Sequence, residues 1–258
     1  MKKNVLITLF ILATVTNVLA QNQLWSSSLS AASREYWGGR FNNMSIGFKF
    51  SPAITFVSFE GVKNFKGMSD GAAKINMTVG PVADFYFAQK YAFSTGLWYT
   101  VKGVSYNIYN SFYDTDVFVQ KPLTKDEIKA NAAEFNLQYL QIPVSLKIFS
   151  DQVTPGMPFY IQFGGTLDIN IAEKPVNYAK NALVQYRDRV SPNSGIFGFG
   201  EANLLLGAGF EKKLGTGTDA FFFGLQYQRG LSEINRGSSF ADMITKTNQL
   251  VIDFGLKF

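Results

Sequence analysis

The stretch QLVIDFGLKF, residues 249–258, decides the fold of this chain. Its large apolar residues recur at every second position, so they share one side of an extended chain, whereas Gln249, Asp253 and Lys257 lie on the other side. Ten residues is also about the length of a strand that crosses a membrane at a tilt. The pattern therefore predicts a membrane-crossing β-strand with one apolar face and one mostly polar face.

Seven further segments alternate in the same way. They run from about Ser45 to Phe56, Lys74 to Ala88, Tyr91 to Tyr106, Phe135 to Phe149, Phe159 to Ala172, Ile196 to Lys212 and Ala220 to Gln228. The connections between them alternate between long and short. Outer-membrane barrels have short periplasmic turns and long external loops. We therefore predict an all-β fold, an eight-stranded antiparallel up-and-down transmembrane barrel with both termini on the periplasmic side.

The volume of the barrel interior decides whether the apolar face of the strands points inward or outward. A soluble lipocalin also has eight strands, but its apolar face points inward. The interior of an eight-stranded barrel is only just filled by its own inward side chains, so the many Phe, Ile and Leu residues of one phase cannot all enter it. Charged residues facing lipid would cost about 2–4 kcal/mol each at mid-depth. We therefore expect the apolar face to meet lipid and the polar face to line the lumen.

The predicted lumen contains charges of both signs, and these can offset one another as buried pairs. Its charged members are Lys49, Asp84, Lys102, Lys147, Asp168, Glu201 and Asp253. Three interpretations remain open at this stage: a solid polar core that holds the barrel together, a gated ion path or internal binding site, and a catalytic carboxylate pair. Pro52, Pro81 and Pro143 fall inside predicted strands, where we expect bulges or strand ends.

The composition narrows the range of functions. Of the 258 residues 17% are charged and 16% aromatic, which fits a chain whose solvent is partly lipid. The chain contains no Cys and no His, which excludes disulfides, thiol nucleophiles, His-based triads and His/Cys zinc sites. The basic residues never form a run of the kind that binds a phosphate backbone. We expect no cofactor, no metal, no catalytic residue and no nucleic-acid partner.

The N-terminus predicts export. Residues 1–20 combine Lys2 and Lys3 with a short apolar run and small residues that end at Ala20, as in a secretory signal peptide cleaved after Ala20. The sequence therefore divides into a signal peptide at 1–20, a lead-in at 21–43 and a barrel at 44–258. Within the long connection at 107–134, LTKDEIKANAAEF (residues 123–135) has a capping box and predicts a short helix.

Four segments together resemble the PorT-like outer-membrane β-barrel family of Bacteroidetes. They are LQYLQIPVSLKI (137–148), YIQFGGTLDIN (160–170), NLLLGAGFE (203–211) and FFFGLQYQRGLSEI (221–234). The resemblance implies an eight-stranded outer-membrane barrel in a diderm bacterium, and some members belong to the type IX secretion and gliding machinery. The matching motifs are barrel-building residues, so the resemblance carries over no catalytic or ligand residue.

Three functions follow as hypotheses. The first is a non-enzymatic structural or accessory component of an outer-membrane assembly, with lipid, the β-barrel assembly machinery and possible secretion subunits as partners. The second is a small pore, and the third is a lipid-modifying barrel enzyme, which the absence of His disfavours. At the chain end, Phe254, Leu256 and Phe258 resemble the signal that the assembly machinery reads, and we expect them to direct insertion and closure against the first strand.

Overall fold

The computed structural model describes residues 44–61, 68–108, 133–178, 181, 183–184, 187–188, 195–214, 219–235 and 243–258. The predicted signal peptide, its cleavage site at Ala20 and the lead-in at 21–43 lie outside these residues, as does most of the predicted helix at 123–135. The last residues of that helix, 133–135, instead begin a strand. No helix among the described residues is long and apolar enough to cross a membrane.

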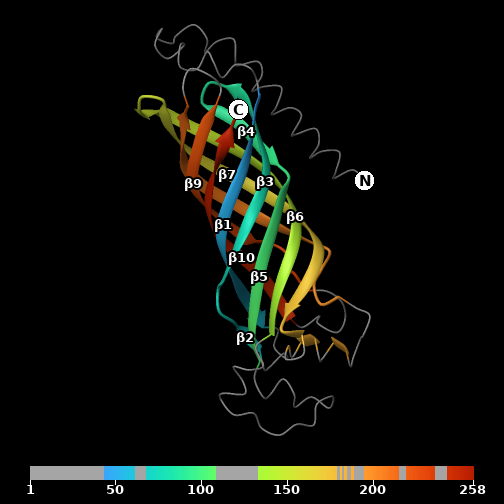
Figure 1. The fold of residues 1–258 in the computed structure, drawn as a ribbon. Helices are drawn as coiled ribbons and strands as arrows, with labels where there is room; N and C mark the ends of the chain where they lie inside the picture. Colours follow the sequence, from blue (N-terminus) through green and yellow to red (C-terminus); the bar gives the residue numbers. More distant parts are fainter. Residues whose placement is uncertain are drawn as a thin grey trace, which may run out of the picture.

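The described chain forms one closed antiparallel sheet (Figure 1). Its strands are β1 (Met44–Gly61), β2 (Met68–Asp70), β3 (Lys74–Ala88), β4 (Tyr91–Gly96), β5 (Trp98–Ile108), β6 (Ala133–Thr154), β7 (Met157–Val176), β8 (Gly200–Lys213), β9 (Ala220–Gly230) and β10 (Met243–Lys257). Strands β4 and β5 together form one wall strand, and β2 prolongs the line of β3, so the ring has eight members. The barrel closes where β1 pairs with both β3 and β10. The predicted eight-stranded up-and-down barrel is confirmed.

The connections give the barrel two different ends. The last residues of β1, β5, β7 and β9 and the first residues of β3, β6, β8 and β10 lie at the end that also carries β2, which we call the loop end (Figure 1). The short connections 89–90 and 155–156, together with the last residues of β8 and the first residues of β9, lie at the opposite end, which we call the turn end. The first residues of β1 and the last residues of β10 pair with each other at the turn end, as Gly47 with Lys257.

The prolines lie inside strands, so the bulges or strand ends predicted at Pro52, Pro81 and Pro143 are not found in β1, β3 and β6. The register between β1 and β10 is the same on both sides of Pro52, where Phe50 pairs with Phe254 and Ala53 with Val251. Pro81 and Pro143 lie on either side of the break between β4 and β5 at Leu97, where the Leu97 amide and the Trp98 indole both donate to the Pro81 carbonyl. A proline has no N–H to offer a neighbouring strand. Because of this break, the predicted continuous strand from Tyr91 to Tyr106 is two strands in the structure.

The strands are longer than the alternating patterns predicted. Strand β6 has 22 residues, about twice the 9–11 that a tilted membrane crossing needs. The five residues of β6 that follow Phe149 extend it towards the turn end, whereas β1 and β10 extend towards the loop end, to Gly61 and back to Met243. The predicted strand at Ile196 is the exception, because β8 begins only at Gly200 and Ile196 is buried in a loop.

The polarity of the two faces inverts along the barrel. Between Leu140 and Ile148 the outward residues of β6 are all apolar, whereas its outward residues nearer the loop end are Gln138, Asn136 and Glu134. The inward residues change in the opposite sense, from Gln141 to the apolar residues Tyr139, Leu137 and Phe135. Strand β1 shows the same change. In these two strands the apolar exterior therefore covers the turn-end part, and the loop-end part is built like a soluble barrel.

Candidate functional site in the barrel lumen

The lumen of the membrane-facing part is lined by polar side chains that are almost completely shielded from solvent. All seven charged residues predicted for the lumen lie there, each with at most 4% of its surface exposed: Lys49, Asp84, Lys102, Lys147, Asp168, Glu201 and Asp253. They come from β1, β3, β5, β6, β7, β8 and β10, one from each strand. The structure brings them together as three groups along the barrel axis.

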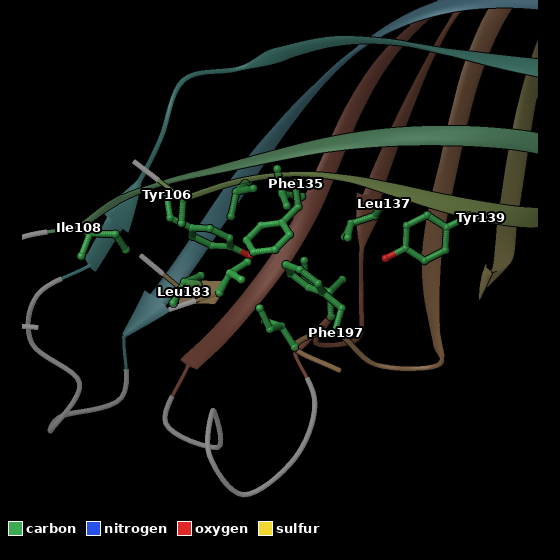
Figure 2. Close-up of a cluster of buried hydrophobic side chains, with 13 residues drawn as sticks. Tyr106, Ile108, Phe135, Leu137, Tyr139, Leu183 and Phe197 are labelled. Carbon is green, nitrogen blue, oxygen red and sulfur yellow. The ribbon is translucent and has the colours of Figure 1, made fainter. Parts of the chain in front are cut away.

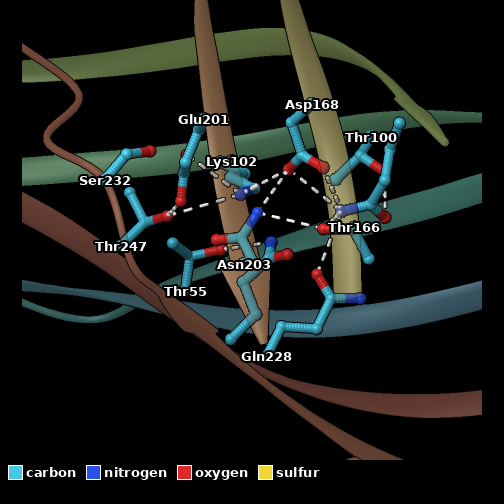
Figure 3. Close-up of polar contacts among 12 residues, drawn as sticks. Thr55, Thr100, Lys102, Thr166, Asp168, Glu201, Asn203, Gln228, Ser232 and Thr247 are labelled. Carbon is cyan, nitrogen blue, oxygen red and sulfur yellow. Dashed lines mark hydrogen bonds and ion pairs between the residues drawn. The ribbon is translucent and has the colours of Figure 1, made fainter. Parts of the chain in front are cut away.

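The group nearest the loop end is centred on Lys102. Its ammonium lies 2.7 Å from Asp168 Oδ2 and 3.1 Å from Glu201 Oε2 (Figure 3). Thr247 donates to the other oxygen of Glu201, and Gln141 Nε2 donates to Asp168 at 2.9 Å. Every charged member is therefore held by partners on other strands, which is the condition for burying charge without a large penalty. One lysine here faces two carboxylates.

The middle group pairs Lys49 of β1 with Asp253 of β10. The Lys49 ammonium lies 2.6 Å from Asp253 Oδ1 and 3.6 Å from the centre of the Trp98 ring. Ser51 Oγ and Gln226 Nε2 donate to the same carboxylate at 2.7 and 2.5 Å. Because β1 and β10 are the strands that close the barrel, this ion pair links the two ends of the sheet from inside.

The group nearest the turn end contains two residues that sequence reasoning missed. Asp84 contacts Lys147 at 3.0 Å and also accepts from Lys257, which in turn lies 2.5 Å from Glu211 Oε2. Both Lys257 and Glu211 are buried. The alternation contained the signal for both, because Lys257 shares its phase with Asp253 and Glu211 shares its phase with Glu201.

Apolar clusters occupy the lumen beyond the polar groups. At the loop end, side chains from β1, β5, β6 and the connections pack together as a group that we call the apolar cap (Figure 2). Its members are Val57, Val104, Tyr106, Ile108, Ala133, Phe135, Leu137, Tyr139, Leu183, Val184, Ile196, Phe197 and Ile234, with Phe59 packed against them. Phe135 and Phe197 meet edge to face at 5.0 Å. Towards the turn end, Tyr86, Ala92, Phe149 and Tyr160 form a second, smaller cluster.

The filled lumen limits what the interior can do chemically. The carboxylates meet lysines rather than an open space where a substrate could lie. Among the described residues, no group of three or more Asp and Glu side chains is placed to hold a metal ion. The arrangement is that of a cross-linked polar core, in which hydrogen bonds join residues far apart in sequence, such as Ser51 and Asp253.

The predicted assembly residues lie at the turn end of β10. Phe254 packs edge to face on Phe50 of β1 at 5.7 Å, and Leu256 and Phe258 are exposed on the outer surface. The Phe258 amide donates to the Ile46 carbonyl at 2.8 Å, so the final residue still takes part in the pairing with β1. Their role in assembly stays a prediction.

The fold and the exterior define a class of protein: a closed β-barrel with an apolar outer belt crosses a membrane, and such barrels are typical of outer membranes. The model of the outer membrane protein beta-barrel domain family matches residues 20–236, well over half of the chain. The chain belongs to the outer membrane protein beta-barrel domain family, and its location is the bacterial outer membrane.

Solved structures of similar fold come from several bacteria. Ail, the attachment invasion locus protein of Yersinia pestis in complex with the heparin analogue sucrose octasulfate, is 12% identical with a TM-score of 0.38, over 84% of this chain and 99% of Ail. Neisserial surface protein A is 9% identical with a TM-score of 0.40, over 82% of this chain and 97% of its own. The N-terminal β-barrel domain of Pseudomonas aeruginosa OprF is 8% identical with a TM-score of 0.33, over 80% and 96%. No curated protein matches the sequence.

Proposed function

We propose that this barrel is a non-enzymatic structural or accessory component of an outer-membrane assembly. The observation that carries the proposal is the filled lumen, in which three groups of paired charges lie between apolar clusters. A conducting pore needs a hydrated path through the barrel. Porin barrels of about 16–18 strands are wide enough to leave such a path, whereas the interior of an eight-stranded barrel is filled by its own side chains. With its interior filled, the protein offers its loops, its turns and its outer surface for function.

The non-enzymatic part of the proposal rests on chemistry. The chain has no His and no Cys, so general base and nucleophile roles fall to carboxylates and hydroxyls. The carboxylates of the lumen groups are engaged by lysine, hydroxyl or amide donors, such as those that hold Asp84, Asp168 and Asp253. A carboxylate held in this way serves the stability of the barrel.

The proposed orientation places the loop end outside the cell and both chain ends in the periplasm. The support is the asymmetry of the connections, because outer-membrane barrels carry their short turns on the periplasmic side. The polar outer surface beyond the apolar belt would then stand in the glycolipid layer at the cell surface.

The proposed partners follow from the PorT-like resemblance and the membrane location. They are outer-membrane lipid, the β-barrel assembly machinery and subunits of a secretion assembly, of which type IX protein secretion in Bacteroidetes is the one that the sequence motifs favour. In the structure those motifs form parts of the adjacent strands β6 to β9.

The test is affinity purification from mildly solubilised outer membranes at native abundance. We expect the barrel to carry other outer-membrane or periplasmic subunits with it, and recovery of monomer alone would count against an accessory role. The same purified barrel should stay silent in a planar lipid bilayer beside a reconstituted porin that conducts. Steady conductance would instead support the small pore.

A further inference from the structure

The acidic and basic side chains buried in the lumen are not equal in number. Among the described residues they are Lys49, Lys102, Lys147 and Lys257 on one side, and Asp84, Asp168, Glu201, Glu211 and Asp253 on the other. The turn-end group has two of each kind and the middle group has one of each kind. The extra carboxyl group therefore belongs to the group centred on Lys102, where one ammonium faces two carboxyl groups.

The surroundings of the Lys102 group make an unbalanced charge costly. The side chains of Lys102, Asp168 and Glu201 have no exposed surface, and the Lys102 ammonium lies 5.0 Å from the centre of the Tyr139 ring of the apolar cap. Within the described part of the chain, no second lysine or arginine pairs with either carboxyl group. Because a buried ionised carboxylate needs a positive partner, two that share one site are relieved when one of them is protonated.

The contacts of Asp168 favour a proton over a bound cation as the missing positive charge. The Lys102 ammonium contacts both carboxyl groups and so takes the place that a cation would need. The amide groups of Gln141 and Asn203 direct N–H donors at Asp168, and such donors repel a cation. A proton needs only one oxygen on one of the two carboxyl groups.

The hydrogen bonds of Asp168 leave no place for that proton. Gln141 Nε2 donates to both oxygens of Asp168, at 2.9 and 3.0 Å, and Asn203 Nδ2 donates to Oδ2 at 3.1 Å. The Lys102 ammonium also lies 2.7 Å from Oδ2. Amide N–H and ammonium groups can only donate. A protonated Asp168 would therefore point its hydrogen at the hydrogen of a donor.

Glu201 has an oxygen that can carry the proton. Its Oε2 accepts from Lys102 at 3.1 Å, whereas its Oε1 contacts the hydroxyl of Thr247 (Figure 3). A hydroxyl can accept as well as donate, so a protonated Glu201 can donate to Thr247 Oγ1 in the same geometry. Lys102 then keeps Asp168 as its ionised partner.

We propose that Glu201 holds a proton in the folded barrel and donates a hydrogen bond to Thr247 of β10. The ammonium groups and ionised carboxylates buried in the lumen are then equal in number, and the core of the barrel is electrically neutral. This assignment goes beyond the structural role proposed for the lumen groups, because it makes Glu201 a buried proton-binding site rather than a member of an ion pair.

The infrared spectrum of the purified, detergent-solubilised full chain at neutral pH tests the proposal. A protonated carboxyl group absorbs at a higher frequency than a carboxylate or an amide, and exposed carboxyl groups are ionised at neutral pH. We expect a carboxylic-acid band that shifts when the glutamate side chains carry carbon-13 in their carboxyl groups and does not shift when the aspartate side chains do. E201Q should remove the band. D168N should also remove it, because Glu201 then becomes the ionised partner of Lys102.

The same substitution at two glutamates gives an independent readout. E201Q replaces a neutral acid with a neutral amide, so urea unfolding should show a change in the folding equilibrium constant of less than about 5-fold. The matched control is E211Q, which removes an ionised carboxylate 2.5 Å from Lys257. E211Q should lower the folding equilibrium constant by about 100-fold or more and leave the infrared band in place.

Three results would overturn the proposal. Absence of a carboxylic-acid band would show that the lumen holds no protonated acid. A band that follows the aspartate label would place the proton on a residue other than Glu201. A loss of stability in E201Q as large as that in E211Q would show that Glu201 is ionised. If E201Q fails to fold, judged by loss of heat modifiability, the two isotope labels in the parent chain alone decide the question.

Discussion

At the residue scale, Lys257 shows how a lumen side chain can be placed by sequence and yet remain unassigned. Alternation puts it on the polar face of the last strand. Its partners Asp84 and Glu211 belong to β3 and β8, and no local pattern connects them to it. The Lys257 ammonium also lies 5.6 Å from the centre of the Phe222 ring. It therefore links two carboxylates and an aromatic ring in a site without solvent.

The substitution K257M tests this role. It removes the ammonium that Glu211 and Asp84 share, and breaking a buried pair typically costs about 3–5 kcal/mol because a charge is left without its partner. We expect urea unfolding of the refolded barrel to show a loss of that size. The matched control is K212M, an exposed position on β8, which should change stability by less than about 0.5 kcal/mol. Equal effects of the two variants would refute the role.

At the scale of a single strand, β10 closes the barrel against β1 and also presents exposed apolar residues on the outer surface. Its inner face supplies Asp253 and Lys257 to the lumen, and its outer face supplies Phe254 to the ring contact with Phe50. Phe258 differs, because 62% of its surface is exposed while its amide is bonded to Ile46. Because the ring is exposed, recognition during assembly stays the role that we predict for it.

Deleting Phe258 should therefore reduce the amount of heat-modifiable barrel in the membrane fraction. The expected control is F258W, which keeps an aromatic ring at the same place and should preserve assembly. The stability of the purified variant, once refolded in detergent, should stay close to that of the parent, since only one backbone hydrogen bond is lost, worth about 1 kcal/mol. Unchanged membrane levels after the deletion would contradict a signalling role.

At the scale of the whole molecule, the barrel combines two kinds of construction. The turn-end part has lipid outside and paired charges inside, whereas the loop-end part has polar residues outside and the apolar cap inside. Length explains the combination, because strands such as β6 are about twice as long as one membrane crossing. Beyond the lipid, water surrounds the outer wall and the hydrophobic effect acts inward.

The proposed orientation can be tested with two single cysteines. Tyr178 is 55% exposed at the loop end and Val153 is 61% exposed at the turn end. On intact cells, a membrane-impermeant maleimide should label Y178C but should label V153C only after lysis. The reverse result would place the chain ends outside the cell.

The sequence predicts which side chains face the lumen, but it does not predict which of them contact one another. The first depends on neighbouring residues, whereas the second depends on residues far apart along the chain. The phase of Lys49 or Glu201 follows from its immediate neighbours. That Ser51 bonds Asp253, 202 residues away, depends on how the sheet closes. The start of β8 was predicted too early for a related reason, since Ile196 and Phe197 are apolar enough for a strand but are buried in the apolar cap instead.

The sequence by itself determined the membrane barrel, the number of its wall strands and the face that meets lipid, because a two-residue period and the volume of a small lumen are properties of local composition. Only the tertiary structure decided which charges pair and where the polarity inverts. Those features depend on register between strands, and register brings Asp84, Glu211 and Lys257 together although no sequence pattern joins them.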